Sequence, residues 1–268
     1  MIPSILRELR DRRVSTIAYC VVAAGTLLMY MGLYPSIHDS AEKFQAIYSS
    51  YPQEFYQALG IQNFSLGTLE GYLAIEYFSI VWLLLAAFFA ASKAGMALAG
   101  EVEKGMMNFY LMLPIGRGKL YIAKYLSFLV TLVLFMLSSV LVIFPLAGMY
   151  KINILTGRMW QVALVSLLFA WAIYAVSLCL SALFSERSKV YMIVGGTLLI
   201  QYIMFVVGGL KKDWDWLYDY TIFHYYNAQS ILNGSSPEWQ GITLFAVLIV
   251  AFSVLGYIIF RRRDIATA

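Results

Sequence analysis

The sequence predicts an all-α integral membrane protein with six transmembrane helices, arranged as one domain over residues 1–268. Hydrophobic residues make up 61% of the chain and charged residues 13%, against about 45–50% and about 25% in soluble domains. The mean hydropathy is +0.74, and the few charges divide the chain into long apolar runs. There is too little charge to cover a soluble surface. The composition therefore excludes a soluble enzyme, a disordered tail and a nucleic-acid-binding domain.

Six apolar runs carry the predicted spans. A helix needs about 20 mainly apolar residues to cross the hydrocarbon core, and a run of this kind satisfies its backbone in lipid only as a helix. Five runs are long enough unaided. The second is long enough if it begins near Tyr72, which places Glu76 about one turn inside the outer boundary. The expected spans are residues 14–34, 72–93, 121–148, 159–184, 190–210 and 240–260.

The distribution of basic residues predicts the orientation of these spans. An even number of spans places both termini on one side, and lysine and arginine are enriched in cytoplasmic loops. Fourteen basic residues lie on the side of the termini or at its helix ends, against five on the other side, which predicts cytoplasmic termini. The first span is too long for a signal-peptide core and no small-residue cleavage site closes it, so we expect it to be retained.

The first 13 residues predict an amphipathic helix that lies in the inner membrane interface. Apolar residues recur at helical spacing from Ile2 to Leu9, while Arg7, Arg10 and Arg13 fall mainly on the opposite face. The alternative is a frayed basic tail that only sets the topology.

The expected outer loops, residues 35–71 and 211–239, are rich in aromatic side chains. Such side chains favour the membrane interface, where they form an aromatic belt. The alternative is a lid over an exit path, with a re-entrant turn near residues 227–234.

No set of side chains in the sequence predicts catalysis or metal binding. His38 and His224 are far apart and give a weak metal signal, while Cys20 and Cys179 lie in apolar runs as small packing residues. A membrane-embedded enzyme would need nucleophiles, paired acids or histidines within the membrane, and the spans hold one acid, Glu76. We therefore expect no catalytic residue and no metal site.

The loop after the second span, residues 100–119, is the most informative stretch of the sequence. Acidic residues come first, which favours a helix N-terminus, and an apolar run from Met106 to Met112 follows before Pro114 ends it. A short helix that exposes methionine and aromatic side chains is unstable and sticky alone, so it needs a partner surface. The alternative partner is the chain's own membrane domain.

Residues 100–124 resemble the signature of ABC-2 type permeases, glutamate-x-glutamate-x-glycine followed by leucine-x-proline-isoleucine-x-arginine and a lysine. The matching residues are Glu101, Glu103, Gly105, Leu113, Pro114, Ile115, Arg117 and Lys124. Residues 260–265 resemble the phenylalanine-x-arginine-arginine-aspartate terminus common in that family. The six spans, the amphipathic start and the short inner loop at residues 185–189 match as well, so the resemblance covers nearly the whole chain. Met106 departs from the pattern, because the family often has threonine there.

The resemblance implies the membrane subunit of an ABC exporter with an ABC-2 or type V exporter-like fold. In that family residues 100–114 would form a coupling helix that docks in a groove of a separate ATPase subunit, present in two copies. The coupling residues expected here are Glu101, Glu103, Gly105, Met106, Phe109, Tyr110, Leu111, Pro114 and Arg117. Two permeases lie side by side in the family fold, which implies a homodimer in the plasma membrane. The path between them is lined largely by the second and fifth spans.

The sequence itself lacks a nucleotide site of the phosphate-loop kind. Such a loop reads glycine, four residues, then Gly-Lys-Ser/Thr, whereas the only Gly-Lys pair, at residues 118–119, is followed by Leu120 and lacks the earlier glycine. We therefore expect no cofactor on this chain, with ATP and Mg bound by the partner ATPase. The other expected partner is the lipid bilayer, and nucleic acid is not expected.

Two polar side chains within the spans are candidates for the substrate path. Glu76 lies near the outer end of its span, so it either serves a function or reaches outward to water. Gln201 lies in the middle of the fifth span and either lines the path or bonds to a neighbouring helix. The apolar and aromatic surroundings favour a hydrophobic or amphipathic substrate, such as a drug, a peptide or a lipid-like molecule.

Two other functions stay open on the sequence. A secondary transporter or channel would be favoured by charges in the mid-bilayer or by two repeated halves, and neither is evident. A sensory or resistance component could use an ABC-2-like fold without transport. Export rather than import follows from the resemblance alone.

Overall fold

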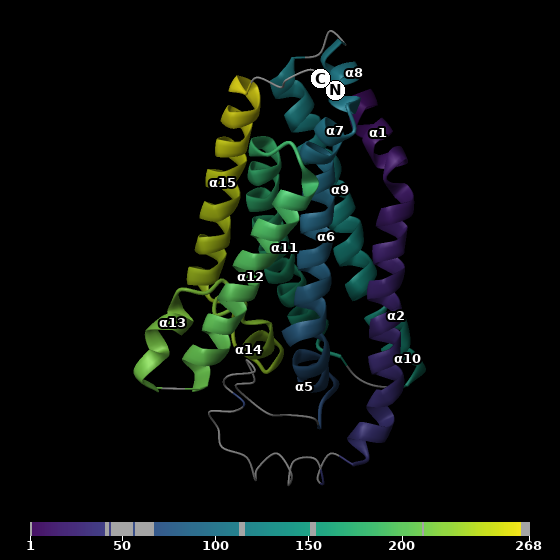
Figure 1. The fold of residues 1–268 in the computed structure, drawn as a ribbon. Helices are drawn as coiled ribbons and strands as arrows, with labels where there is room; N and C mark the ends of the chain where they lie inside the picture. The colour runs from purple at the N-terminus through teal and green to yellow at the C-terminus, as the bar shows by residue number, and fades with distance from the viewer. Residues whose placement is uncertain are drawn as a thin grey trace.

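A computed structural model describes residues 2–40, 43, 56, 67–112, 116–150, 154–210 and 212–263. These residues form a bundle of long helices, and no strand occurs among them (Figure 1). The first described helix, α1 (Ile2–Asp11), and the end of the last, α15 (Trp239–Arg262), lie at the same end of the bundle, beside α7 (Ala99–Glu103) and α8 (Met106–Met112). We call this the terminal end. Helices α5 (Leu69–Leu73), α10 (Ile143–Met149), α13 (Asp215–Asp219) and α14 (Ala228–Leu232) lie at the opposite end.

Six helical segments are long and apolar enough to cross a membrane, which confirms the predicted number of spans and makes the chain a multi-pass membrane protein. They extend a few residues beyond the expected spans, and the first runs through Pro35. The segments are α2 (Arg13–His38), α5–η1–α6 (Leu69–Leu73, Ala74–Val81 and Trp82–Ala97), α9–α10 (Arg117–Leu141 and Ile143–Met149), α11 (Thr156–Leu183), α12 (Arg187–Leu210) and α15 (Trp239–Arg262). The shorter helices are α1 (Ile2–Asp11), α7 (Ala99–Glu103), α8 (Met106–Met112), η2 (Lys212–Trp214), α13 (Asp215–Asp219) and α14 (Ala228–Leu232).

Helix α11 forms the centre of the bundle and packs against α6, α9 and α15. Small residues permit these contacts, because close packing rather than a hydrophobic driving force holds helices together in lipid. At Gly256 of α15, an added Cβ would lie 3.1 Å from the Cα of Cys179 and 2.6 Å from the Tyr121 hydroxyl. Near the terminal end, the buried Ser181 of α11 accepts a hydrogen bond of 2.9 Å from the backbone N–H of Ala99.

The close approach at Gly256 leads to a prediction. Gly256→Leu is expected to force α15 away from α11 and to destabilise the protein by about 1–3 kcal/mol, the usual cost of overpacking a core. The measurement is the thermal unfolding midpoint of the purified protein in detergent. Gly148→Ala is the control, because no atom lies within 4 Å of the position that its added Cβ would take. Equal midpoints for the two variants would contradict the packing argument.

The second span is not a regular α-helix. Its residues Ala74–Val81 form a π-helix, η1, in which the Ser79 hydroxyl donates a hydrogen bond of 2.6 Å to the carbonyl oxygen of Ala74. π-Helical segments are rare and often occur at functional sites. This irregular segment carries Glu76, whose side chain is half-buried.

The segment that follows α13 returns into the bundle. Ala228, Ile231 and Leu232 of α14 are buried, and the helix contacts α11 and η1. The Tyr226 ring stacks on Trp82 at 6.1 Å, and its hydroxyl lies 2.8 Å from that of Ser166. This part of the expected outer loop therefore packs inside the bundle, whereas Trp216 and Tyr220 of the preceding stretch are exposed.

Candidate functional site

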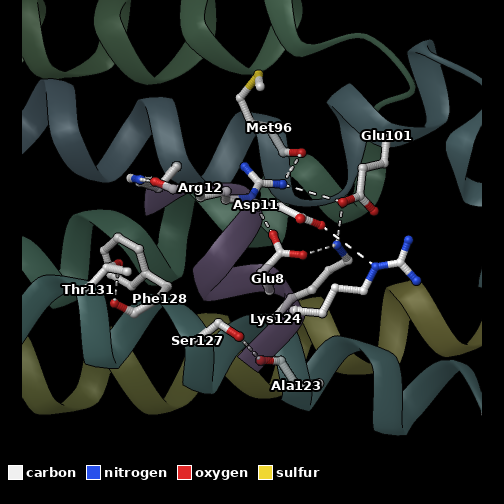
Figure 2. A network of polar contacts seen from close by, with 12 residues as sticks. Glu8, Asp11, Arg12, Met96, Glu101, Ala123, Lys124, Ser127, Phe128 and Thr131 are labelled. Carbon is white, nitrogen blue, oxygen red and sulfur yellow. Dashed lines mark hydrogen bonds and ion pairs between the residues drawn. The ribbon is translucent and has the colours of Figure 1, made fainter. Parts of the chain in front are cut away.

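Four charged side chains from three segments meet at the terminal end of the bundle (Figure 2). We call Glu8, Arg12, Glu101 and Lys124 the ionic cluster. The ammonium of Lys124 lies 2.5 Å from Glu101 Oε1 and 3.2 Å from Glu8 Oε2. Arg12 pairs with Glu8, lies 3.4 Å from Glu101 Oε1, and donates a 2.9 Å hydrogen bond to the carbonyl oxygen of Met96. The cluster therefore joins α1, α7 and α9 and ties them to the end of α6.

Burial makes these ion pairs more costly to break than surface ion pairs. The side chains of Lys124 and Glu101 are only 3% and 5% exposed, and removing one partner of such a pair leaves an uncompensated buried charge. Burial raises the pKa of Glu101, although the nearby Lys124 opposes the shift. Burial also acts to raise the pKa of Glu8, but Lys124 and Arg12 outweigh it and hold that pKa below its usual value. Glu8 is therefore the more firmly ionised of the two carboxylates.

The two glutamates of α7 connect it to different spans. Whereas Glu101 reaches α1 and α9, Glu103 accepts a 3.0 Å hydrogen bond from the backbone N–H of Arg187, the first residue of α12. The Glu103 carboxylate also lies 3.7 Å from the Arg187 side chain in a half-exposed ion pair. A displacement of α7 would therefore act on α9 and on α12 at the same time.

Helix α8 has one face packed against the bundle and one face exposed. Met107 is buried, and the Tyr110 ring lies 5.0 Å from the Lys124 ammonium and 5.8 Å from the Arg7 guanidinium, so it makes cation–π contacts. Burial raises the pKa of Tyr110. On the other face, Phe109 is 73% exposed, with Met112 and Met106 beside it at helical spacing. An apolar patch of this kind marks an interaction surface.

The expected coupling helix over residues 100–114 is two helices in the structure. Helix α7 ends at Glu103, and Gly105 adopts φ +69°, a left-handed conformation that glycine tolerates and other residues rarely do. This turn separates the acidic residues of α7, of which Glu101 is buried and Glu103 is not, from the exposed apolar face of α8. Pro114 and the side chain of Leu111, both expected in the coupling site, lie outside the described residues.

The left-handed turn leads to a second prediction. Gly105→Ala is expected to weaken the turn by about 1 kcal/mol, because an L side chain is strained at this φ, and no neighbouring atom adds a clash. Amide hydrogen exchange in α8 should then rise about fivefold. Gly116→Ala is the control, because Gly116 has φ −61° and an equally open surrounding. Unchanged exchange in α8 would show that the turn needs no glycine.

Residues beyond the coupling motif also shape this end of the bundle. Arg263 donates 2.9 Å hydrogen bonds to the carbonyl oxygens of Ala182 and Phe184 at the end of α11, and Arg117 donates to the carbonyl oxygen of Arg263. Arg117, expected in the coupling site, is therefore bonded to the end of α15 and not to the ionic cluster.

Sequence reasoning did not assign Glu8 and Arg12 to the site. Their spacing of four on one amphipathic helix was the signal that could have identified them.

A cavity of about 610 Å³ lies between α6 and α12, and we call it the lateral cavity. Its lining carries no charged side chain and consists mainly of aliphatic and aromatic groups, with hydroxyls at intervals. The lining residues are Tyr19, Ser79, Ile80, Leu83, Leu84, Ala87, Phe88, Ala91, Ser92, Tyr191, Val194, Gly195, Leu198, Leu199, Tyr202 and Phe223. Its size is that of small-molecule binding sites in proteins, which are also mostly apolar.

The two polar candidates for the substrate path lie near this cavity but are not among its lining residues. Gln201 Oε1 accepts a hydrogen bond of 3.2 Å from the backbone N–H of Ile222, which ties α12 to the segment after α13. Glu76 lies in η1, four residues before Ile80, and Ile80 does line the cavity.

The comparison with known families agrees with this architecture. A family model described as ABC-2 family transporter protein matches residues 2–265, which is nearly the whole chain. No curated protein matches the chain significantly. Membership of this family makes the chain a membrane subunit of an ABC transporter rather than an enzyme in itself, and implies association with an ABC ATPase. With its six spanning helices and its matching sequence, the chain belongs to the ABC-2 family of transporter proteins.

Proposed function

We propose that the chain is the permease of an ATP-driven exporter in the plasma membrane, with both termini in the cytoplasm. Two copies of a separate ATPase subunit bind ATP and Mg and dock on the exposed apolar face of α8. The observation that supports the proposal is that α8 has one face packed against the bundle and one apolar face exposed. Met107 and Tyr110 anchor this helix to the bundle beside a buried ionic cluster, while Phe109 and Met112 are left exposed at the terminal end.

The same contacts support a mechanical role. Closure of the ATPases on ATP would displace α8, and α8 is joined to α7 through the turn at Gly105. Helix α7 would pass the displacement to α9 through the ion pair of Glu101 with Lys124, because breaking a buried ion pair is costly. It would act on α12 through the hydrogen bond that Glu103 accepts from the backbone N–H of Arg187. Two states of the permease are required, and ATP binding shifts the balance between them.

The lateral cavity supports a hydrophobic or amphipathic substrate. A charged substrate would lose its hydration in a lining without charged side chains, which is costly, whereas a drug, peptide or lipid-like molecule gains from the apolar contacts. Helix α12 presents exposed apolar residues next to the cavity, including Met192, Leu199 and Ile200. A second permease placed against this face would complete the path as a homodimer, and the direction of export follows from the family resemblance.

The experiment that tests this function uses the permease together with its ATPase subunit in lipid vesicles. Apolar compounds are screened for stimulation of ATP hydrolysis, and hits are followed by uptake into vesicles whose ATPase faces outward. We expect ATP-dependent uptake that is lost when the ATPase is inactivated. Transport driven by an ion gradient without ATP would instead indicate a secondary transporter. Complex formation without transport of any compound would favour a sensory role.

A further inference from the structure

A small second cavity lies against the ionic cluster, inside the bundle. Its volume is about 20 Å³, enough for one occupant of the size of a water molecule. Figure 2 shows part of its α9 side, with Ser127, Phe128 and Thr131. The lining residues are Glu8, Leu9, Arg12, Lys93, Ala97, Lys124, Ser127, Phe128, Thr131 and Tyr174.

The charges around this cavity do not balance. Arg12, Lys93 and Lys124 supply three positive charges, and Glu8 and Glu101 supply two negative ones. Lys93 is the unpaired member, because no carboxylate of the described residues lies within ion-pair distance of its ammonium.

Only neutral groups contact the ammonium of Lys93, which lies 5.6 Å from the centre of the Phe89 ring in a cation–π contact. It donates to the Thr16 hydroxyl at 2.7 Å and to the backbone carbonyl oxygen of Arg12 at 3.3 Å. With Lys93 only 5% exposed, a buried cation is left with one N–H to spare and no counter-charge. Such a group is costly in a membrane domain unless an anion accompanies it.

A buried hydroxyl on the same cavity also lacks a partner. The Tyr174 side chain is fully buried, and its hydroxyl makes no hydrogen bond within the described part of the chain. The nearby Ser127 and Thr131 hydroxyls donate to the carbonyl oxygens of their own helix. Tyr174 and Lys93 are thus donors with unused capacity on one small cavity, and buried donors are normally satisfied.

We propose that this cavity binds one small inorganic anion of the size of chloride, held by the ammonium of Lys93 and the hydroxyl of Tyr174. A water molecule would satisfy the hydroxyl but would leave the positive charge uncompensated. The volume is too small for a phosphate, a sulfate or a lipid headgroup, which leaves a monatomic anion. The bound anion would neutralise the point where α1, α6, α9 and α11 meet, and this inference does not depend on the transport function.

The test measures thermal unfolding of the purified full-length chain in detergent, with chloride replaced by gluconate at constant ionic strength. Gluconate is too large for the cavity. Chloride is expected to raise the unfolding midpoint saturably by about 5 °C, the shift that a ligand of this kind produces at about 100 times its Kd. Binding of radiolabelled chloride should saturate at one ion per chain.

Three variants make the test specific. Lys93→Met is expected to lose the response to chloride and to be at least as stable as the wild type in gluconate, because the unpaired charge is gone. Tyr174→Phe should keep the fold and raise the half-saturating chloride concentration about tenfold, through loss of one hydrogen bond to a charged ligand. Tyr121→Phe is the matched control, because its hydroxyl donates to the Ser253 carbonyl and does not line the cavity. Equal midpoints in chloride and gluconate, or the same response in all variants, would overturn the proposal in favour of a water molecule alone.

Discussion

Replacing Glu101 with arginine is expected to abolish coupled transport. The substitution would exchange the buried carboxylate beside Lys124 and Arg12 for a third cation, and breaking a buried ion pair in this way costs about 3–5 kcal/mol. Helix α7 would then separate from α9 and no longer transmit the movement of α8. In the complex with the ATPase, ATP hydrolysis should persist while transport falls at least about tenfold, a loss that about 1.4 kcal/mol of coupling energy would produce.

Two further variants separate coupling from folding. Lys124→Glu in the Glu101→Arg background restores an opposite-charge pair, so it should recover part of the transport if the ion pair itself carries the coupling. Glu186→Gln is the control, because the ion pair of Glu186 with Lys189 is exposed at the same end of the bundle, and pairs of this kind contribute about 0–1 kcal/mol. Transport at the wild-type level in Glu101→Arg would remove the ionic cluster from the mechanism.

The membrane spans could be predicted from the sequence because each span depends only on the residues of one continuous run. Long runs without charge cannot be solvated except by lipid, and six such runs became six helices. The apolar run from Met106 to Met112 predicted a short helix in the same way, and α8 covers these residues. The break at Gly105 was not predicted, because acidic residues followed by an apolar run are equally compatible with one continuous helix.

The ionic cluster could be predicted only in part because its members are distant in sequence. Glu101 was expected in the coupling site from the family motif. Lys124 is part of the same motif, but no function was predicted for it. Their contacts with Glu8 and Arg12 depend on how α1 packs against α9, and no local pattern specifies this arrangement. The lateral cavity is likewise a property of the packing of α6 and α12, since most of its lining residues are ordinary residues of the second and fifth spans.

Replacing Phe109 with serine is expected to weaken binding of the ATPase without unfolding the permease. The side chain is 73% exposed, so its loss removes little packing within the chain. If it inserts into a groove of the ATPase, truncation should cost about 2 kcal/mol or more, as for the central aromatic residues of other interfaces. This corresponds to a rise in Kd of about 30-fold, which is measured with the two purified subunits in detergent.

Met149→Ser provides a matched control for this prediction. Met149 is 74% exposed, as Phe109 is, but it ends α10 at the opposite end of the bundle (Figure 1). A general effect of removing an exposed apolar side chain would therefore appear in both variants, whereas loss of a docking contact would appear only in Phe109→Ser. If both variants bind the ATPase as the wild type does, the exposed face of α8 is not the docking surface. The apolar patch there would then contact the membrane or another protein. In that case, ATPase docking on α8 could not drive the displacement proposed to pass through Glu101 to α9.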